Sequence, residues 1–255
     1  MKSPLRKRLP RELKSEFGKY LVVFIMMAIT IGFVSGFLVA DGSMLRAYDD
    51  SFQKYNIEDG YFQTKKKLTP AQKEDIEKSD VKVYENFYIE QKLTNGSTIR
   101  FFKNRKEVDK VCLMNGKMPK KSGEIAVDRM YADNNELKVG DTVKSRKKTF
   151  RITGLVALSD YSALFQNNND TMFDAVKFGV AIVTDKDFEA LNQVKVQYNY
   201  AWIYDKKPAT EKKEKKMAED LMEDMADVVT IESFVPQYQN QSIHFTGDDM
   251  GSDRA

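Results

Sequence analysis

Apolar residues fill one uninterrupted stretch near the N-terminus of this 255-residue chain. Residues 20–39 (YLVVFIMMAITIGFVSGFLV) carry no charged side chain. At about 1.5 Å rise per residue, a helix of this length crosses a hydrocarbon core of about 30 Å. The pattern therefore predicts a transmembrane helix over residues 20–40.

A cleaved signal peptide is the rival interpretation of the same stretch. The apolar core of a signal peptide spans about 7 to 15 residues and is followed by a small-residue cleavage site. The stretch here is longer, and residues 39–43 (VADGS) fit such a site only weakly. We therefore expect the helix to be retained.

Basic residues dominate the segment before the helix. Residues 1–19 contain seven Lys or Arg against two Glu, and such an excess marks the cytoplasmic side of a membrane. Leu5, Leu9, Leu13 and Phe17 recur at every fourth position, which predicts a basic amphipathic segment lying on anionic membrane lipid. A solvated basic tail is the alternative. In both cases we expect a cytoplasmic N-terminus and a main domain that is extracytoplasmic.

Small residues recur along the predicted membrane helix, at Ala28, Gly32, Ser35, Gly36 and Ala40. Large apolar side chains gain little by leaving lipid, whereas small ones let a second helix approach closely. The stripe predicts packing against another membrane helix and a dimeric assembly, although glycine is also common in membrane helices generally. No second long apolar run follows, so we expect the partner helix to come from another chain or from sequence beyond residue 255.

Beyond the membrane helix, the pattern alternates between helical and strand-like segments. Helical spacing predicts a stalk helix over residues 41–56, and Thr69-Pro70 is typical of a helix start. Asn95-Gly96 predicts a hairpin between residues 81–93 and 98–103. The other predicted helices are residues 129–135, a short helix capped by Asp185 and a long helix after Pro208; the other predicted strands are residues 60–64, 110–114, 124–128, 141–146, 149–158, 178–184, 194–204 and 228–233.

The order of these elements predicts an α+β fold. We expect an α/β core built from residues 57–105 and 170–233. A smaller, mostly β subdomain would be inserted over residues 106–169, and residues 234–255 would form a polar connector.

Charge and cysteine content narrow the possible partners and the compartment. The chain has 41 basic and 38 acidic residues; without residues 1–19, 34 basic and 36 acidic residues remain, a net charge of −2. Nucleic-acid binding requires a basic surplus, so we expect no nucleic-acid partner. Cys112 is the only cysteine, so core packing and not a disulfide must hold the outer domain together.

Enzyme signatures do not occur in the sequence. His244 is the only histidine and lies in the predicted connector, which excludes a Ser-His-Asp triad or a multi-histidine zinc site in the packed part. Neither GxGxxG nor GxxxxGK[ST] occurs, so nucleotide binding has no support. We expect a non-catalytic protein with no cofactor, no metal and no catalytic residue.

One loop stands out as a candidate partner contact. Aromatic and apolar residues flank the polar loop at residues 167–170. They would contact a partner or fold back onto their own domain, and the sequence leaves both possibilities open. These residues are Tyr161, Leu164, Phe165, Met172 and Phe173.

Residues 115–155 resemble the extracytoplasmic core domain of FtsX-like and MacB-like ABC transporter permeases. That family shows G-x-x-P, then GEI, a short helix, VGD, and a strand ending in hydrophobic-x-G-hydrophobic. The matching positions here are Gly116 and Pro119, Gly123-Glu124-Ile125, Val139-Gly140-Asp141 and Ile152-Thr153-Gly154-Leu155.

The resemblance implies a Porter-like α/β domain with an inserted Sabre-like subdomain, carried on the membrane helix. It also implies a cytoplasmic ABC ATPase as partner, together with further membrane helices of the same or a second permease. The function would be to transmit ATP-driven motion across the membrane for export or envelope remodelling. The alternative is a single-pass binding or sensor module that homodimerises through Ala28, Gly32 and Gly36.

Overall fold

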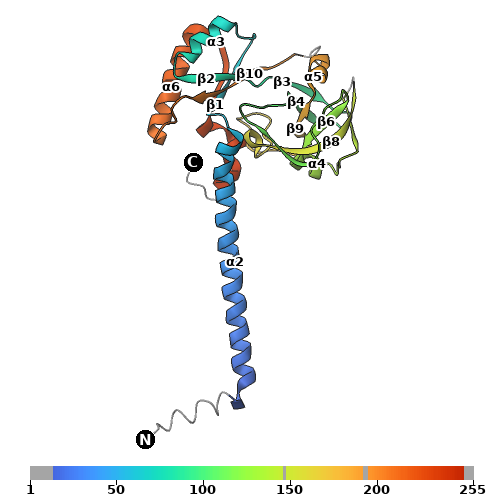
Figure 1. The fold of residues 1–255 in the computed structure, drawn as a ribbon, viewed down its shortest axis with the longest axis vertical. Coiled ribbons are helices and arrows are strands. Elements are labelled where there is room, and N and C mark those ends of the chain that lie inside the picture. Colours follow the sequence, from blue (N-terminus) through green and yellow to red (C-terminus); the bar gives the residue numbers. More distant parts are fainter. Residues whose placement is uncertain (1–13, 146–147, 192–194, 250–255) are drawn as a thin grey trace. The chain divides into compact units, whose positions relative to one another are not determined.

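The computed structural model describes residues 14–145, 148–191 and 195–249 (Figure 1). They form two compact units that meet between Tyr48 and Asp49. The first part of the predicted amphipathic segment (1–13), position 146 of one predicted strand, position 194 of another and the end of the connector (250–255) lie outside the described residues.

Helix α2 (Phe17–Tyr55) joins the predicted membrane helix and the predicted stalk into one element of 39 residues. Among the described residues it is the one helix long and apolar enough to cross a membrane, and its apolar part is not buried. Its small residues are exposed, and a Cβ added at Gly32 or Gly36 would meet nothing within 4 Å. The small-residue stripe therefore has room for a second helix.

Four antiparallel strands form the first sheet of the second unit, in the order β11-β1-β10-β2. The strands are β1 (Gly60–Thr64), β2 (Val81–Glu85), β10 (Tyr198–Tyr204) and β11 (Ile231–Pro236). Helices α3 (Pro70–Glu77) and α6 (Glu211–Val228) pack on it, and their Ile76, Leu221 and Met225 join Phe62 and Trp202 in one core.

Both covering helices begin where the sequence predicts. Thr69 and Gln72 form a reciprocal capping box at α3, with Pro70 at its first position, and the Thr210 side chain caps α6. These contacts satisfy backbone N–H groups that a helix start leaves unpaired.

The second sheet follows the order β3-β4-β9-β6-β8-β5, with β7 also paired to β8. Two pairs, β4 with β9 and β6 with β8, are parallel. Every residue of β9 (Phe178–Val183) is buried, as its continuous apolar sequence predicts. The other strands are β3 (Tyr88–Lys92), β4 (Thr98–Lys103), β5 (Val111–Gly116), β6 (Glu124–Asp128), β7 (Thr142–Lys144) and β8 (Thr149–Leu158); the helices are α4 (Arg129–Asn134) and α5 (Asp185–Leu191).

Glycines of the family-like motif let two strands of this sheet come close together. Gly116 has φ +76, and a Cβ there would lie 2.3 Å from the Thr153 carbonyl oxygen. A Cβ at Gly154 would lie 2.6 Å from the Lys117 carbonyl oxygen. Only glycine fits such an approach without moving the backbone, so the motif has a structural reason.

The mixed α+β fold is confirmed, but the chain changes sheets earlier than predicted. The predicted strand over 81–93 is two strands, because the chain leaves the first sheet after β2 and enters the second at β3. The Asn86 N–H donates to the Asn199 carbonyl, and the ring of Phe87 packs against Tyr200. Strands β3, β4 and β9, predicted in the α/β core, thus belong to the larger sheet together with the insert. The hairpin across Asn95-Gly96 is confirmed as β3–β4.

Two further predictions need correction. The cap of α5 is Thr184, whose side chain and carbonyl accept from the N–H groups of Asp187 and Phe188; Asp185 is already helical. The polar connector predicted from residue 234 is partly ordered, since β11 runs to Pro236 and helix α7 spans Gln241–Asp249. Val235 and Ile243 are buried there, and these few apolar positions anchor an otherwise polar segment.

Candidate functional site

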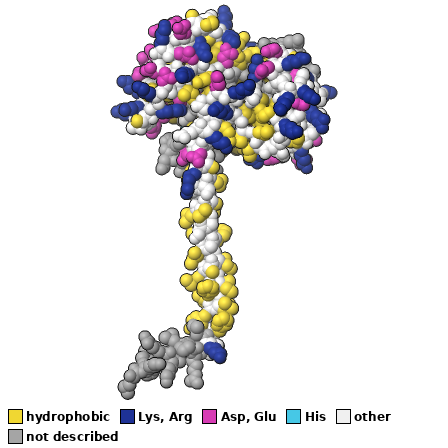
Figure 2. Space-filling view, viewed as in Figure 1, with side chains coloured by type: hydrophobic (Ala, Val, Ile, Leu, Met, Phe, Trp, Pro, Cys, Tyr) yellow, Lys and Arg dark blue, Asp and Glu magenta, His cyan; other side chains and the backbone are white. Residues whose placement is uncertain are grey.

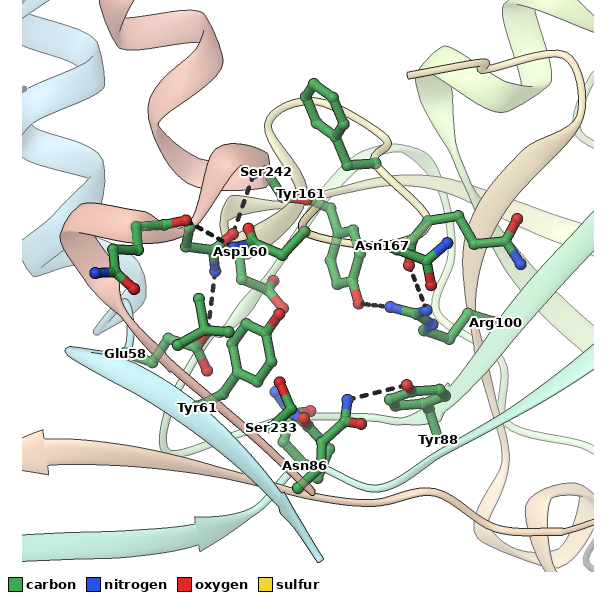
Figure 3. Close-up of a pocket in the computed structure, with 18 of the residues that line it drawn as sticks. Glu58, Tyr61, Asn86, Tyr88, Arg100, Asp160, Tyr161, Asn167, Ser233 and Ser242 are labelled. Carbon is green, nitrogen blue, oxygen red and sulfur yellow. Dashed lines mark hydrogen bonds between the residues drawn. The ribbon is translucent and has the colours of Figure 1, made fainter. Parts of the chain in front are cut away.

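A polar cavity of about 390 Å³ lies between the two sheets (Figure 3). Tyr61 of β1 and Ser233 of β11 line it from the first sheet, and Tyr88 of β3 and Arg100 of β4 from the second. Carboxamide side chains dominate the rest of the lining: Gln63, Asn86, Gln166, Asn167, Asn168, Asn169, Asn199, Gln239 and Asn240.

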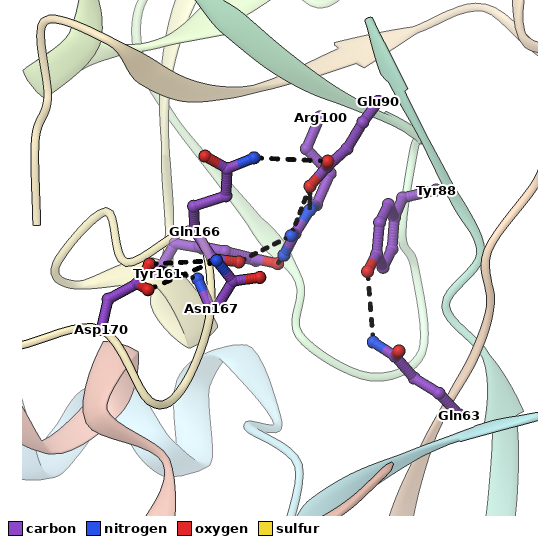
Figure 4. A network of polar contacts seen from close by, with 8 residues as sticks. All are labelled: Gln63, Tyr88, Glu90, Arg100, Tyr161, Gln166, Asn167 and Asp170. Atoms are coloured by element: carbon purple, nitrogen blue, oxygen red, sulfur yellow. Dashed lines mark hydrogen bonds and ion pairs between the residues drawn. The ribbon is translucent and has the colours of Figure 1, made fainter. Parts of the chain in front are cut away.

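Arg100 holds one wall of the cavity in place (Figure 4). Its Nε and Nη2 donate to Glu90 Oε1 at 2.9 and 2.5 Å. Its Nη1 donates to the Tyr161 hydroxyl at 2.5 Å, and Nη2 to the Gln166 carbonyl at 2.8 Å. The guanidinium also lies over the Tyr88 ring, 4.1 Å from its centroid. With these partners, the buried Arg100 acts as a clamp for the loop at residues 161–166.

The predicted contact loop folds back onto its own domain. Leu164 and Phe165 are buried, so they belong to the interior and not to an exposed contact surface. Phe165 and Phe173 pack edge-on against each other and against Phe245 of α7, with ring centroids 5.3 to 5.6 Å apart. Met172 is 81% exposed. Of the five predicted residues, Met172 therefore stays fully available to a partner, and Tyr161 lines the cavity.

A buried cluster of charged groups lies beside the cavity. Glu58, which lines the cavity, precedes β1, and Asp160 lies in the short 3₁₀ helix η1 (Ser159–Tyr161). Arg105 donates to both oxygens of Asp160, at 2.6 and 2.7 Å. Asp109 Oδ1 accepts from the Glu58 N–H at 2.9 Å, and its Oδ2 accepts from Asn86 Nδ2 at 3.2 Å.

Burial, together with an excess of three acids over one base, raises the pKa of two carboxyl groups in the cluster. Burial, reinforced by Asp109 and Asp160, raises the pKa of Glu58 well above its ordinary value. Burial and the Asp160 charge raise the pKa of Asp109 to about 7, although Arg105 acts in the opposite direction. Like charges in a site with little water disfavour the ionised form. Glu58 and Asp109 therefore bind a proton more readily than exposed carboxyl groups do.

The cluster also lies where two distant parts of the chain meet. The Lys110 N–H donates to the carbonyl of Tyr55, the last residue of α2, at 2.8 Å. On the other side, Asn240 Nδ2 lies 3.4 Å from Glu58 Oε1, and the Gln237 N–H donates to the Asp59 carbonyl at 2.8 Å. The end of α2 and the segment that follows β11 are therefore tied to the same few residues.

Metal or nucleophile chemistry finds no support in the geometry. In the described part of the chain, no group of three or more His, Cys, Asp or Glu side chains is arranged to hold a metal ion. Cys112 is half-buried in β5, and His244 is buried in α7. The lining instead offers hydrogen-bond donors and acceptors to a polar group.

Sequence reasoning did not find this cavity. Glu58, Arg100 and Asp160 are ordinary charged residues in the sequence, and only the pairing of distant strands brings them together. The signal that was available is the density of Asn and Gln at residues 166–169 and 237–241, two segments that both reach the lining.

Comparisons with known proteins were made for sequence and structure. No protein-family model and no curated protein matches the chain. In structure, the chain is similar to the periplasmic region of MacB from Actinobacillus actinomycetemcomitans, with 14% identity over 74% of this chain and 92% of that one and a TM-score of 0.38. It is also similar to the extracellular domain of the noncanonic ABC-type transporter YknZ from Gram-positive bacteria, with 12% identity, coverage of 68% and 98%, and a TM-score of 0.34. At these scores, the likeness alone establishes neither fold nor function for this chain.

Proposed function

We propose that this chain forms the membrane helix and extracytoplasmic domain of an FtsX-like or MacB-like ABC transporter permease. The observation that carries the proposal is helix α2, which is unbroken from its apolar part to Tyr55 and is then hydrogen-bonded into the domain through Lys110 and Asp109. The glycines of the family-like motif support it, because Gly116 and Gly154 occupy positions in β5 and β8 that only glycine fits.

The proposed orientation follows the distribution of charge. The basic segment before α2 would lie in the cytoplasm, on anionic lipid, and the domain outside. Figure 2 shows hydrophobic side chains along α2, and Lys, Arg, Asp and Glu side by side over the second unit. Such a mixed surface suits an aqueous compartment, and the net charge of −2 outside residues 1–19 provides no basic surplus for nucleic acid.

The proposed mechanism is mechanical. A separate cytoplasmic ATPase would bind and hydrolyse ATP and move the membrane helices. The last turn of α2 would pass that motion to the loop at residues 106–110 through Tyr55 and Asn56, whose carbonyls accept from Lys110 and Asp109 at 2.8 and 3.0 Å. No residue of this chain would catalyse a reaction.

Packing of α2 against another membrane helix completes the proposal. Ala28, Gly32, Ser35, Gly36 and Ala40 would face a helix of the same or a second permease in a dimeric assembly. A single-pass sensor that homodimerises through the same residues is the second candidate, because the exposed stripe supports both.

Co-purification with an ATPase subunit separates the two candidates. The full-length gene would be expressed with a neighbouring ATPase gene, and the chain isolated in mild detergent. A permease retains the ATPase at a fixed stoichiometry, and Gly32→Leu with Gly36→Leu lowers the yield of the complex. Ile31→Leu with Phe37→Leu, which keeps the apolar character, is the matched control. A stable homodimer that never retains an ATPase would contradict the permease and favour the sensor.

A further inference from the structure

The cavity between the two sheets contains hydrogen-bond acceptors that lack donors. Glu58 and Asn199 are 2% and 7% exposed, and both line the cavity. Glu58 Oε2 and Asn199 Oδ1 have no hydrogen-bond partner among the residues that the structure describes. A buried acceptor without a donor is destabilising, so both atoms point to a group that donates hydrogen bonds.

Charge at this end of the cavity favours a cation. Glu58 lies close to Asp109 and Asp160, and the single base Arg105 is already paired with Asp160. Ionised, the three acids and one base carry a net negative charge in a site of low polarity, where attraction to a cation is strong.

At the opposite end of the cavity, the Arg100 guanidinium is already paired and is not available to an anion. Arg100, which lies across the cavity from Glu58 in Figure 3, already donates to Glu90, Tyr161 and Gln166. A carboxylate or phosphate ligand would have to displace these partners. The remaining lining consists mainly of carboxamides and tyrosine hydroxyls, which both donate and accept.

We infer that this cavity binds a small organic molecule that presents a primary ammonium group to Glu58 and hydroxyl or amide groups to the surrounding Asn and Gln side chains. The volume of about 390 Å³ lies at the lower end of the range for small-molecule sites. The inference concerns the cavity alone and does not depend on the proposed permease function.

Binding of an ammonium group would be linked to proton release. Without a ligand, burial and the Asp109 charge favour the protonated form of Glu58; a bound cation favours the ionised form. The titratable and charged groups that act on Glu58 are Asp109, Asp160 and Arg105, together with Tyr61 of β1, the strand that follows Glu58. Because only the ionised form of Glu58 pairs with an ammonium group, affinity rises as the pH increases from 5.5 to 8.

Three matched probes test the inference by titration calorimetry on the full chain in lipid nanodiscs. They are trans-4-aminocyclohexanol, trans-1,4-cyclohexanediol and trans-4-hydroxycyclohexanecarboxylate, which share one ring and differ in charge. We expect the amine to bind at least tenfold more tightly than the diol, and the carboxylate to show no saturable binding. The binding enthalpy should also depend on the ionisation enthalpy of the buffer, because a proton is released.

Substitutions test whether the amine binds in the cavity. Glu58→Gln should weaken amine binding at least tenfold and abolish the buffer dependence, whereas Glu232→Gln, on the exposed face of β11, leaves both unchanged. Tyr61→Phe, which removes a hydroxyl but keeps the ring, should weaken binding severalfold without unfolding the domain. Equal binding of amine and diol, preference for the carboxylate, absence of saturable amine binding, or amine binding that Glu58→Gln leaves unchanged would overturn the inference.

Discussion

Two sites in the second unit bury carboxyl groups, and the pKa shifts at the two sites are opposite. Asp187 of α5 is fully buried, yet it accepts hydrogen bonds from Ser122 Oγ at 2.6 Å, from the Gly123 N–H at 2.7 Å and from Lys148. Burial acts to raise its pKa, but these three donors outweigh it and lower the pKa overall. Glu58 and Asp109 are equally buried, but they lie beside a third acid and have higher pKa values.

The difference lies in the hydrogen-bond donors that surround each carboxyl group. The Asp187 carboxylate accepts from three donors and connects α5 to the Gly123-Glu124 segment of the family-like motif. The Glu58 carboxyl group lacks a donor to Oε2 among the described residues, and it lies against the cavity and next to the end of α2. Perturbed pKa values cluster at functional sites, which agrees with the ligand proposed for this cavity.

Replacing Arg105 should have the largest effect on the free energy of unfolding, because Arg105 is the one base in the cluster beside Glu58. Arg105→Met leaves Asp160 buried without its partner, and we expect a loss of about 3 to 5 kcal/mol in the free energy of unfolding. Urea denaturation of the full chain in detergent measures it. Arg129→Met is the control: it breaks an ion pair with Asp133 whose side chains are more than half exposed, and should cost less than about 1 kcal/mol. Similar losses for both variants would contradict the assignment.

Removing each carboxylate in turn should separate the two sites. Asp187→Asn weakens the bonds from Lys148, Ser122 and Gly123, and we expect it to lower the free energy of unfolding by about 1 to 3 kcal/mol. Glu58→Gln removes like-charge repulsion and should be neutral or stabilising. Thermal unfolding compares the two variants, and a greater loss for Glu58→Gln would reverse the comparison.

The pH dependence of stability should come from Asp109 in the cluster beside Glu58. With a pKa of about 7 for Asp109 against an ordinary value of 3.8, the folded chain binds more protons than the unfolded chain between these values. Stability therefore falls as pH rises, by about 2 kcal/mol between pH 5.5 and 8. Asp109→Asn should flatten this dependence. Stability that stays constant over this range would show that Asp109 is already ionised in the folded protein at pH 5.5.

Removing the Tyr161 hydroxyl, which accepts a hydrogen bond from Arg100, should have a smaller effect on stability. Tyr161→Phe removes the hydroxyl that accepts from Arg100, and we expect a cost of about 1 to 2 kcal/mol, typical of a hydrogen bond to a charged group. Hydrogen exchange should show the change at residues 161–166, with the exchange of β9 unaltered. Equal effects at both places would mean that Arg100 does not hold the loop.

Local signals in the sequence were sufficient for most elements. Thr69-Pro70 predicts the start of α3 because capping involves neighbours only, and Asn95-Gly96 predicts the β3–β4 hairpin for the same reason. The apolar run of β9 identifies a buried strand. In each case the sequence signal itself lies within a few consecutive residues.

Long-range pairing could not be predicted from the same signals. An alternating pattern over residues 81–93 does not show that the chain changes sheets at Asn86, since both strands alternate in the same way. The cavity depends on Glu58, Arg100, Asp160 and Asn240, which are separated by 40 or more residues. These residues come together through the parallel pairing of β4 with β9 and through the ordered segment after β11. The periodicity of the sequence predicts neither of these features.

Accessibility of single cysteines in intact cells tests most directly whether α2 crosses the membrane with the domain outside. In a Cys112→Ser background, Met172→Cys places a thiol on the exposed loop and Lys14→Cys places one before α2. A membrane-impermeant maleimide should label the first in intact cells and the second only after lysis. Labelling in the opposite order, or release of the domain as a soluble protein cut near residue 40, would contradict the proposed anchoring and orientation.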